Sequence, residues 1–170
     1  MVTIEPTLRR RVAKATALPE SLDPLLRQIY ANRGITSETQ LERSLKGLLH
    51  YQDLNGIDVA ISLLVEALKL QSRIVIVGDF DADGATSTAL AIKALRQMGF
   101  QQVSYHIPNR FDDGYGLSPQ VVHDVAKKGV DLIITVDNGI SSFEGVDVAH
   151  EYGIRVLVTD HHLPGHSLPQ

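Results

Sequence analysis

The chain has 170 residues, 44% of them hydrophobic and 21% charged, which is typical of a globular domain and excludes a disordered chain. Its formal net charge of −4 excludes a surface that is basic throughout, so nucleic-acid binding would depend on local patches. The absence of cysteine excludes disulfides and thiolate metal sites and leaves Asp, Glu and His as metal ligands. Because the chain shows no apolar run of roughly 18 residues and no signal-peptide pattern, we expect a cytoplasmic protein.

The segment from about residue 21 to residue 70 has the pattern of a helical region. Ser21 or Asp23 before Pro24 is a start signal for a helix, and Gly34 is a stop signal. The region thus predicts at least one capped helix ahead of the rest of the chain.

A second short helix is predicted by Ser37 and Gln40, which have the spacing of a capping box. Residues 57–70 carry apolar side chains at helical spacing. We therefore expect two parts: a helical lead-in, residues 1–70, packed on a core, and an α/β core, residues 71–170.

From residue 73 the pattern alternates between short apolar runs and amphipathic helices. The expected strands are RIVIV, VSYHI, DLIITV and RVLVT, and the expected helices are ATSTALAIKALRQM, SPQVVHDVAKK and SFEGVDVAHEY. Strands that read as continuous apolar runs are buried on both faces, which is typical of a parallel sheet with right-handed crossovers. The fold class is therefore α/β, a parallel sheet with helices on both faces, preceded by a helical N-terminal segment.

Acidic and imidazole side chains follow three of the four expected strands: Asp79, Asp81 and Asp83, then Asp137, then Asp160, His161 and His162. A single Asp after a strand is usually a turn former or a helix cap. Three such strand ends meet at one edge of a parallel sheet, where ligands bind. Several carboxylates in one crevice repel one another, and a divalent cation is the common compensation.

Two other sites share part of this pattern. The spacing of Asp79, Asp81 and Asp83 matches the opening of an EF-hand loop, but the twelfth position is Leu90 instead of Glu, and a strand precedes the motif. An aspartyl-nucleophile phosphatase also has an Asp-x-Asp pair after a strand, but the paired histidines after the last strand do not fit it. A mixed Asp and His site suits Mn²⁺ well and Mg²⁺ less well, and two ions bridged by a carboxylate are a standard arrangement for phosphodiester hydrolysis.

The segment HIPNRFDDGYGLS after the second expected strand has the residues of a phosphate-binding loop. Asn109 and Arg110 can contact phosphate oxygens, and Gly114 and Gly116 allow a close approach of the backbone. The alternative is an ordinary turn in which Arg110 caps the sheet edge. The amides of residues 84–87, at the start of a helix, could also face an anion.

The motifs GDFDADGATS, PNRFDDGYGLS, TVDNGIS and VTDHH, in this order, resemble the successive motifs of the DHH phosphoesterases. By this resemblance the metal ligands are Asp81, Asp83, Asp137 and His161. Asp79 and Asp160 are implied as ligands or close supports, with Asp160 grouped with the catalytic residue His162, which faces the scissile phosphate. Asn109 and Arg110 are implied to hold the DNA backbone.

Within the family, the lead-in with YANRGI and LERSLKGLL is most similar to that of the single-stranded-DNA exonucleases. The resemblance implies the N-terminal catalytic-core portion of a Mn²⁺- or Mg²⁺-dependent exonuclease, with two ions and 5′ to 3′ polarity, acting in DNA repair and recombination. It implies single-stranded DNA, a helicase and a single-strand-binding protein as partners, and a monomer. Because a further metal-binding Asp and a second domain lie beyond this sequence in the family, we expect the chain alone to be inactive.

Two alternatives stay open. The first is another DHH activity, on short oligonucleotides, cyclic dinucleotides or pyrophosphate, against which the helical lead-in argues. The second is a catalytically inactive α/β module that only binds a nucleotide or a metal, against which the convergent carboxylates argue.

Overall fold

The computed structural model describes residue 9 and residues 17–109 and 113–170. The chain divides into two compact units, residues 1–55 and residues 56–170. Within the described ranges no helix has the length and apolar character needed to cross a bilayer. The second unit holds the sheet and the strand ends on which the expected site depends.

Helix α1, Pro24–Asn32, lies in the first unit and begins where the sequence predicts. Asp23 caps it, because its Oδ1 accepts hydrogen bonds from the backbone N–H groups of Leu25 at 2.8 Å and Leu26 at 3.3 Å. The helix ends just before Gly34, which has a φ of 82°. The start and stop signals are therefore both confirmed.

The remainder of the first unit differs from the expected helical region. It contains three short 3₁₀ turns, Glu38–Leu41, Leu45–Gly47 and Tyr51–Asp53, and each ends at a residue with extended backbone. The Gln40 side chain accepts from the Ser37 N–H at 3.1 Å, as in a capping box, but the turn that follows is too short to be an α-helix. The second expected helix is therefore a single 3₁₀ turn.

Helix α2, Ile57–Leu70, has the bounds that the sequence predicts and lies in the second unit. Ala67 is fully buried and belongs to the same apolar cluster as Ile74 of the sheet. The helix thus packs with the strands. The packing of residues 1–55 on the core stays a prediction.

Four parallel strands form one sheet with the order β2-β1-β3-β4. Their bounds are β1 Ile74–Val77, β2 Val103–His106, β3 Leu132–Val136 and β4 Arg155–Thr159. Each lies within one residue of the apolar run that predicts it. The parallel α/β architecture is confirmed.

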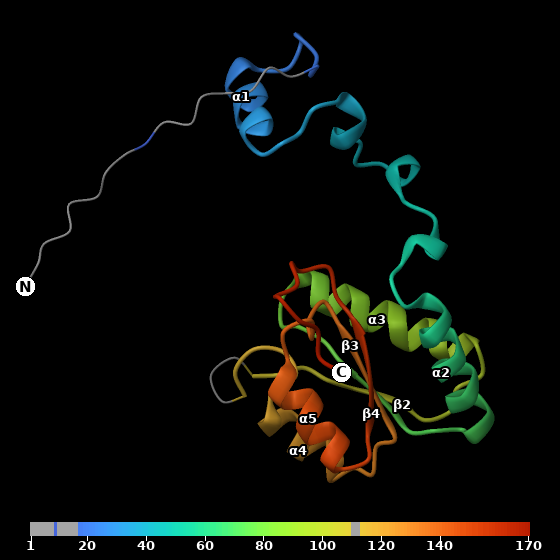
Figure 1. Cartoon of the computed structure of the whole chain (residues 1–170). Coiled ribbons are helices and arrows are strands. Elements are labelled where there is room, and N and C mark those ends of the chain that lie inside the picture. The colour runs from blue at the N-terminus through green and yellow to red at the C-terminus, as the bar shows by residue number, and fades with distance from the viewer. Residues whose placement is uncertain (1–8, 10–16, 110–112) are drawn as a thin grey trace, which may run out of the picture. The chain divides into compact units, whose positions relative to one another are not determined.

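Helices cover both faces of the sheet (Figure 1). Their bounds are α3 Ala82–Gln97, α4 Pro119–Ala126 and α5 Phe143–Glu151. Val75 and Val77 point to one face and pack in a cluster with α4 and α5, whereas Ile74 and Ile76 point to the other face and pack with α2 and α3. Alternate residues of one strand thus fill two cores.

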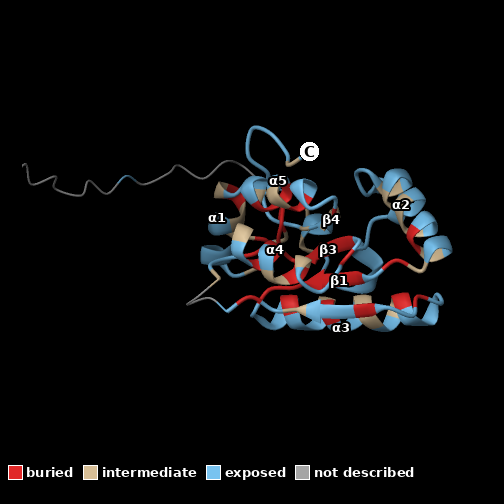
Figure 2. Cartoon of the chain, turned by 90° about the horizontal axis from the view of Figure 1, so that it is seen from below, coloured by how far each residue is buried: buried red, intermediate tan, exposed pale blue. Residues whose placement is uncertain are grey.

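The central strands are more buried than the edge strands, and Figure 2 shows β1 and β3 in the red of buried residues. Every residue of β1 and β3 is buried, as expected for strands covered on both faces. The edge strands β2 and β4 are only partly buried, and Tyr105 of β2 is 60% exposed. Burial on both faces is therefore confirmed for the central pair alone, because an edge strand lacks a neighbour on one side.

Candidate metal centre

The strand order creates a crevice at the carboxyl ends of β1 and β3. The chain passes from β1 to β2 on one side and then returns to place β3 on the other side. Such a reversal is a topological switch point, where ligands of open α/β sheets bind. Asp79 follows β1 and Asp137 follows β3, so the two carboxylates flank this crevice.

Two groups of side chains with metal-ligand chemistry lie at this point. Asp79, Asp81 and Asp137 form one group, and Asp137, His161 and His162 form the other, with the ligand atoms of each group within 4.8 Å of one another. Asp79 and Asp137 are only 5% and 9% exposed. Buried carboxylates that share a crevice repel one another, and a cation offsets that repulsion. Asp137 belongs to both groups and occupies the centre of the site.

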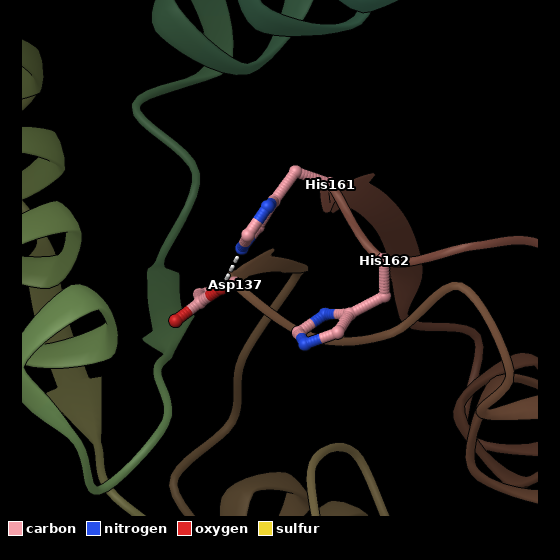
Figure 3. Close-up of side chains that lie close together, drawn as sticks. All are labelled: Asp137, His161 and His162. Atoms are coloured by element: carbon pink, nitrogen blue, oxygen red, sulfur yellow. Dashed lines mark hydrogen bonds and ion pairs between the residues drawn. The ribbon is translucent and has the colours of Figure 1, made fainter. Parts of the chain in front are cut away.

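Asp137 and His161 are in direct contact (Figure 3). The His161 Nε2 atom lies 2.8 Å from Asp137 Oδ1, and the His161 side chain is 72% exposed whereas that of Asp137 is 6% exposed. The backbone of Asp137 has a φ of 63°, which Asp tolerates better than most residues. This turn directs the chain away from the sheet directly after the end of β3.

Asp160 has a different environment from the other carboxylates. Its Oδ2 accepts from the Ile140 N–H at 3.0 Å, and its Oδ1 accepts from the His162 N–H at 3.1 Å and lies 2.6 Å from His162 Nδ1. Burial raises the pKa of Asp160, but the hydrogen bonds from Ile140 and His162 outweigh it, and the net pKa is lowered. Asp160 in turn raises the pKa of His162, first by its hydrogen bond and then by its charge. The contact with Asp160 therefore orients the His162 ring, and the raised pKa favours the protonated form of that ring.

Asp81 and Asp83, both proposed as ligands, lie at the start of α3. Asp81 is the N-cap residue, and its Oδ1 accepts from the Gly84 N–H at 2.9 Å. Asp83 is exposed in the first turn of the helix and lies outside both groups of ligand atoms. The geometry therefore supports Asp81 as a ligand more directly than Asp83.

The expected phosphate-binding residues lie after β2. Arg110 is outside the described residues. Asn109 is exposed, and its backbone N–H donates to Asp113 Oδ2 at 2.8 Å. Gly114 and Gly116 have φ values of 79° and 65°, so the glycines allow a backbone turn that other residues rarely adopt.

Tyr115 is a site residue that the sequence motifs did not indicate. Its hydroxyl donates to the Asp137 carbonyl at 3.5 Å, and its ring makes edge-to-face contacts with Phe80 and His162. Burial of the hydroxyl and the negative charge of Asp79 are the main causes that raise the pKa of Tyr115 to about 12. The feature of the sequence that could have indicated its role is its position between the two glycines of PNRFDDGYG. The residue is a neutral donor among the carboxylates.

A pocket of about 620 Å³ adjoins the centre and is lined by Tyr115, Asp160 and His162. Its far wall consists of the first residues of α4 and α5, including Pro119 and Phe143. Helix N-termini present backbone N–H groups and favour anions. His162 and the helix N-termini favour a polar anionic group in the pocket, although the carboxylates of Asp160 and Glu144 also line it.

Comparison with known proteins decides the family. The model of the DHH family, N-terminal domain, matches residues 73–170. The chain belongs to the DHH family. The family predicted from the motifs is thereby confirmed, and the fold agrees with it.

Relatives of the chain carry the name single-stranded-DNA-specific exonuclease RecJ. The protein of Dickeya dadantii is 62% identical over 95% of this chain, and that of Escherichia coli is 56% identical over 95%. This chain spans 28% of the length of each. The similarity covers the lead-in as well as the sheet, as the resemblance implied.

Two solved structures are also similar. Exonuclease RecJ bound to manganese has a TM-score of 0.65 and 39% identity, covering 72% of this chain and 31% of that one. RecJ of Thermus thermophilus in complex with Mn²⁺ has a TM-score of 0.61 and 34% identity, covering 82% of this chain and 19% of that one. The fold class is confirmed by both.

Proposed function

We propose that this chain forms the catalytic-core part of a metal-dependent phosphodiesterase that degrades single-stranded DNA from an end. The observation that carries the proposal is the position of Asp137, which contributes to two overlapping groups of ligand atoms at the switch point of the sheet. A carboxylate shared by two ligand sets can bridge two cations. The names of the relatives support DNA as the substrate.

The donor set fits Mn²⁺ or Mg²⁺. Carboxylate oxygens and imidazole nitrogens suit these cations, and the buried Asp79 and Asp137 need a positive charge nearby. Asp79, Asp81, Asp137 and His161 would hold the ions, with Asp83 as a further ligand. When bound, the ions would lower the pKa of an attacking water and neutralise a phosphoryl oxygen. Manganese in the similar RecJ structures supports this choice.

His162 would supply the proton that the reaction needs. Asp160 lies 2.6 Å from His162 Nδ1 and raises the pKa of the imidazole, so the ring favours its charged form. The pocket beside His162 offers room for the scissile phosphate. The protonated ring would donate to a phosphate oxygen or to the leaving oxygen.

Asn109 and Arg110 would hold the DNA backbone beside this centre. Arg110 offers a bidentate fork for a phosphate. For the whole protein we propose 5′ to 3′ polarity, a monomeric state, a cytoplasmic location and a role in DNA repair and recombination. A helicase and a single-strand-binding protein would be its partners in that role.

The test uses the full-length protein that contains these residues. Labelled single-stranded DNA, duplex DNA, a dinucleotide and a cyclic dinucleotide are each incubated with Mn²⁺. We expect release of nucleotides from single-stranded DNA alone, abolished by Asp137→Asn and retained by Asp147→Asn, an exposed Asp of α5. Preferential cleavage of the dinucleotides would favour another DHH activity, and binding of Mn²⁺ without any hydrolysis would favour an inactive binding module.

A further inference from the structure

Asn138 is a fully buried polar residue at the floor of the metal centre, directly after Asp137. Its exposed fraction is 0%. The side-chain amide donates two hydrogen bonds, to the Val77 carbonyl at 3.0 Å and to the Val136 carbonyl at 2.9 Å. Both acceptors are carbonyls, so the nitrogen of the amide must face them.

These two carbonyls belong to the last residues of β1 and β3. The ladder between the strands ends with the pair Val77 and Thr135, and the positive φ of Asp137 then turns the chain away from the sheet. The side chain of Asn138 therefore links the strands beyond their last backbone pair. Asn138 directly follows Asp137, and Val77, which accepts one of its hydrogen bonds, lies two residues before Asp79. The link is therefore close in the chain to both carboxylates.

The third segment at this point is the loop that carries Tyr115. A Cβ atom placed on Gly116 would lie 3.3 Å from Asn138 Oδ1 and 3.4 Å from Asn138 Cβ, so the Gly116 backbone packs directly on this side chain. Asn138 thus contacts both strand ends and the loop that places Tyr115 among the carboxylates.

The amide oxygen of Asn138 is buried and has no hydrogen-bond partner among the described residues. An apolar residue of similar size would avoid the burial of this oxygen, but it would leave the Val77 and Val136 carbonyls without the donor that Asn138 supplies. The two donated hydrogen bonds explain the amide, because only a donor can join the carbonyls of both strand ends.

From this arrangement we infer that Asn138 is a positioning residue of the metal centre, which sets the distance between the Asp79 and Asp137 carboxylates. The inference rests on the proposed function, because it assumes that these carboxylates bind a cation. Residues that orient metal ligands typically change metal affinity or activity by roughly 10- to 100-fold when they are replaced.

The experiment compares variants of the full-length protein. Asn138→Ala removes the amide, and Asn138→Leu removes both donors while it keeps a side chain of similar size. Val122→Ala creates a cavity in the apolar core that α4 and α5 share, and it serves as the control for lost stability, because Val122 is fully buried and lies outside both groups of ligand atoms. The measurements are the Kd for Mn²⁺ by calorimetry, the Mn²⁺ dependence of DNA hydrolysis, and Tm.

For both Asn138 variants we expect the Kd for Mn²⁺ to rise by roughly 10-fold or more, with hydrolysis recovered in part at high Mn²⁺. Val122→Ala should lower Tm with an unchanged Kd. If Asn138→Ala and Asn138→Leu do not fold, Asn138→Ser, which keeps one donor, should show a smaller rise in Kd than the roughly 10-fold figure but one that still exceeds the control.

A Kd equal to that of the wild type in the folded Asn138 variants, with only Tm lowered, would overturn the inference and leave the proposed function intact. If the wild-type protein itself bound no Mn²⁺, the proposed function would fail, and this inference with it. The two failures are therefore distinguishable by the wild-type titration alone.

Discussion

The His161 Nε2 atom lies 2.8 Å from Asp137 Oδ1, although the two residues follow different strands and are 24 positions apart in the chain. The contact exists because β3 and β4 are neighbours in register, with Val136 opposite Thr159. The carboxyl ends of both strands therefore lie side by side. This pair therefore joins the ends of two strands at the centre of the site.

The two histidines should have different roles. His161 contacts Asp137, and His162 contacts Asp160. His161→Ala should raise the Kd for Mn²⁺ by roughly 10-fold or more, because it removes a ligand. His162→Ala should lower kcat by about 10²-fold or more with Mn²⁺ still bound, because it removes a proton donor. Calorimetry and steady-state kinetics that gave the reverse assignment would contradict the division.

Asp81 should act both as a helix cap and as a ligand, and two substitutions separate these roles. Asp81→Asn keeps an oxygen that can accept from the Gly84 N–H and should preserve stability, but it should abolish hydrolysis. Asp81→Ala should also lower the free energy of unfolding by about 0.5–2 kcal/mol, because the cap is lost. Denaturant melts and a nuclease assay check both expectations. Retained turnover in the Asn variant would remove Asp81 from the ligand set.

The pair of Asp160 and His162 should show a defined pH dependence. Because the pKa of His162 is raised, its contribution to stability is fully present below the ordinary His pKa and is lost as the pH rises through the raised value. Because the pKa of Asp160 is lowered, its contribution is present above the ordinary Asp pKa and is lost as the pH falls through the lowered value. Both contributions are therefore fully present between the ordinary pKa of Asp and the ordinary pKa of His.

An NMR titration of His162 in metal-free protein tests this pair. Asp160→Asn should move the pKa of His162 down toward its ordinary value, since it weakens the hydrogen bond and removes the charge that together favour the imidazolium. Asp147→Asn, on the exposed side of α5, serves as the control. A His162 titration that Asp160→Asn leaves unchanged would show that another group raises its pKa.

Arg110 should act as a phosphate clamp. In the full-length protein Arg110→Ala should raise KM or the Kd for single-stranded DNA and reduce the salt slope of binding by about 0.7, because one phosphate contact to a single strand is lost. Binding measured at several salt concentrations checks this. Unchanged DNA affinity together with a lower Tm would favour the alternative of a structural cap.

The 170-residue chain by itself should fold but show no significant exonuclease activity. We expect folding because the chain contains both apolar cores of the sheet. We expect no activity because the metal centre is open to solvent, with the His161 side chain 72% exposed. Circular dichroism and an assay on labelled single-stranded DNA with Mn²⁺ and Mg²⁺ check this. Robust release of nucleotides that Asp81→Ala abolishes would show that these residues suffice.

Local pattern alone determined the elements of the second unit and the residue types at the strand ends. Apolar runs predict β1 and β3 because a strand covered on both faces needs apolar side chains at every position. The bounds of α2 follow from its helical spacing. The lead-in was less predictable, because three- and four-residue 3₁₀ turns have too few positions to show a period.

Tertiary structure alone decided which strand ends are neighbours. The order β2-β1-β3-β4 places Asp79 beside Asp137 and leaves Asn109 after the edge strand β2, on the other side of β1 from β3. It also brings Tyr115 among the carboxylates and lets Asn138 bond to Val77, which lies 61 residues away in the chain. Periodicity reports only which face of an element is buried, whereas strand pairing depends on contacts between distant segments. The candidate metal ligands of the centre are thus visible in the sequence, but their neighbours Tyr115 and Asn138 and the distances between all of them arise only when the sheet assembles.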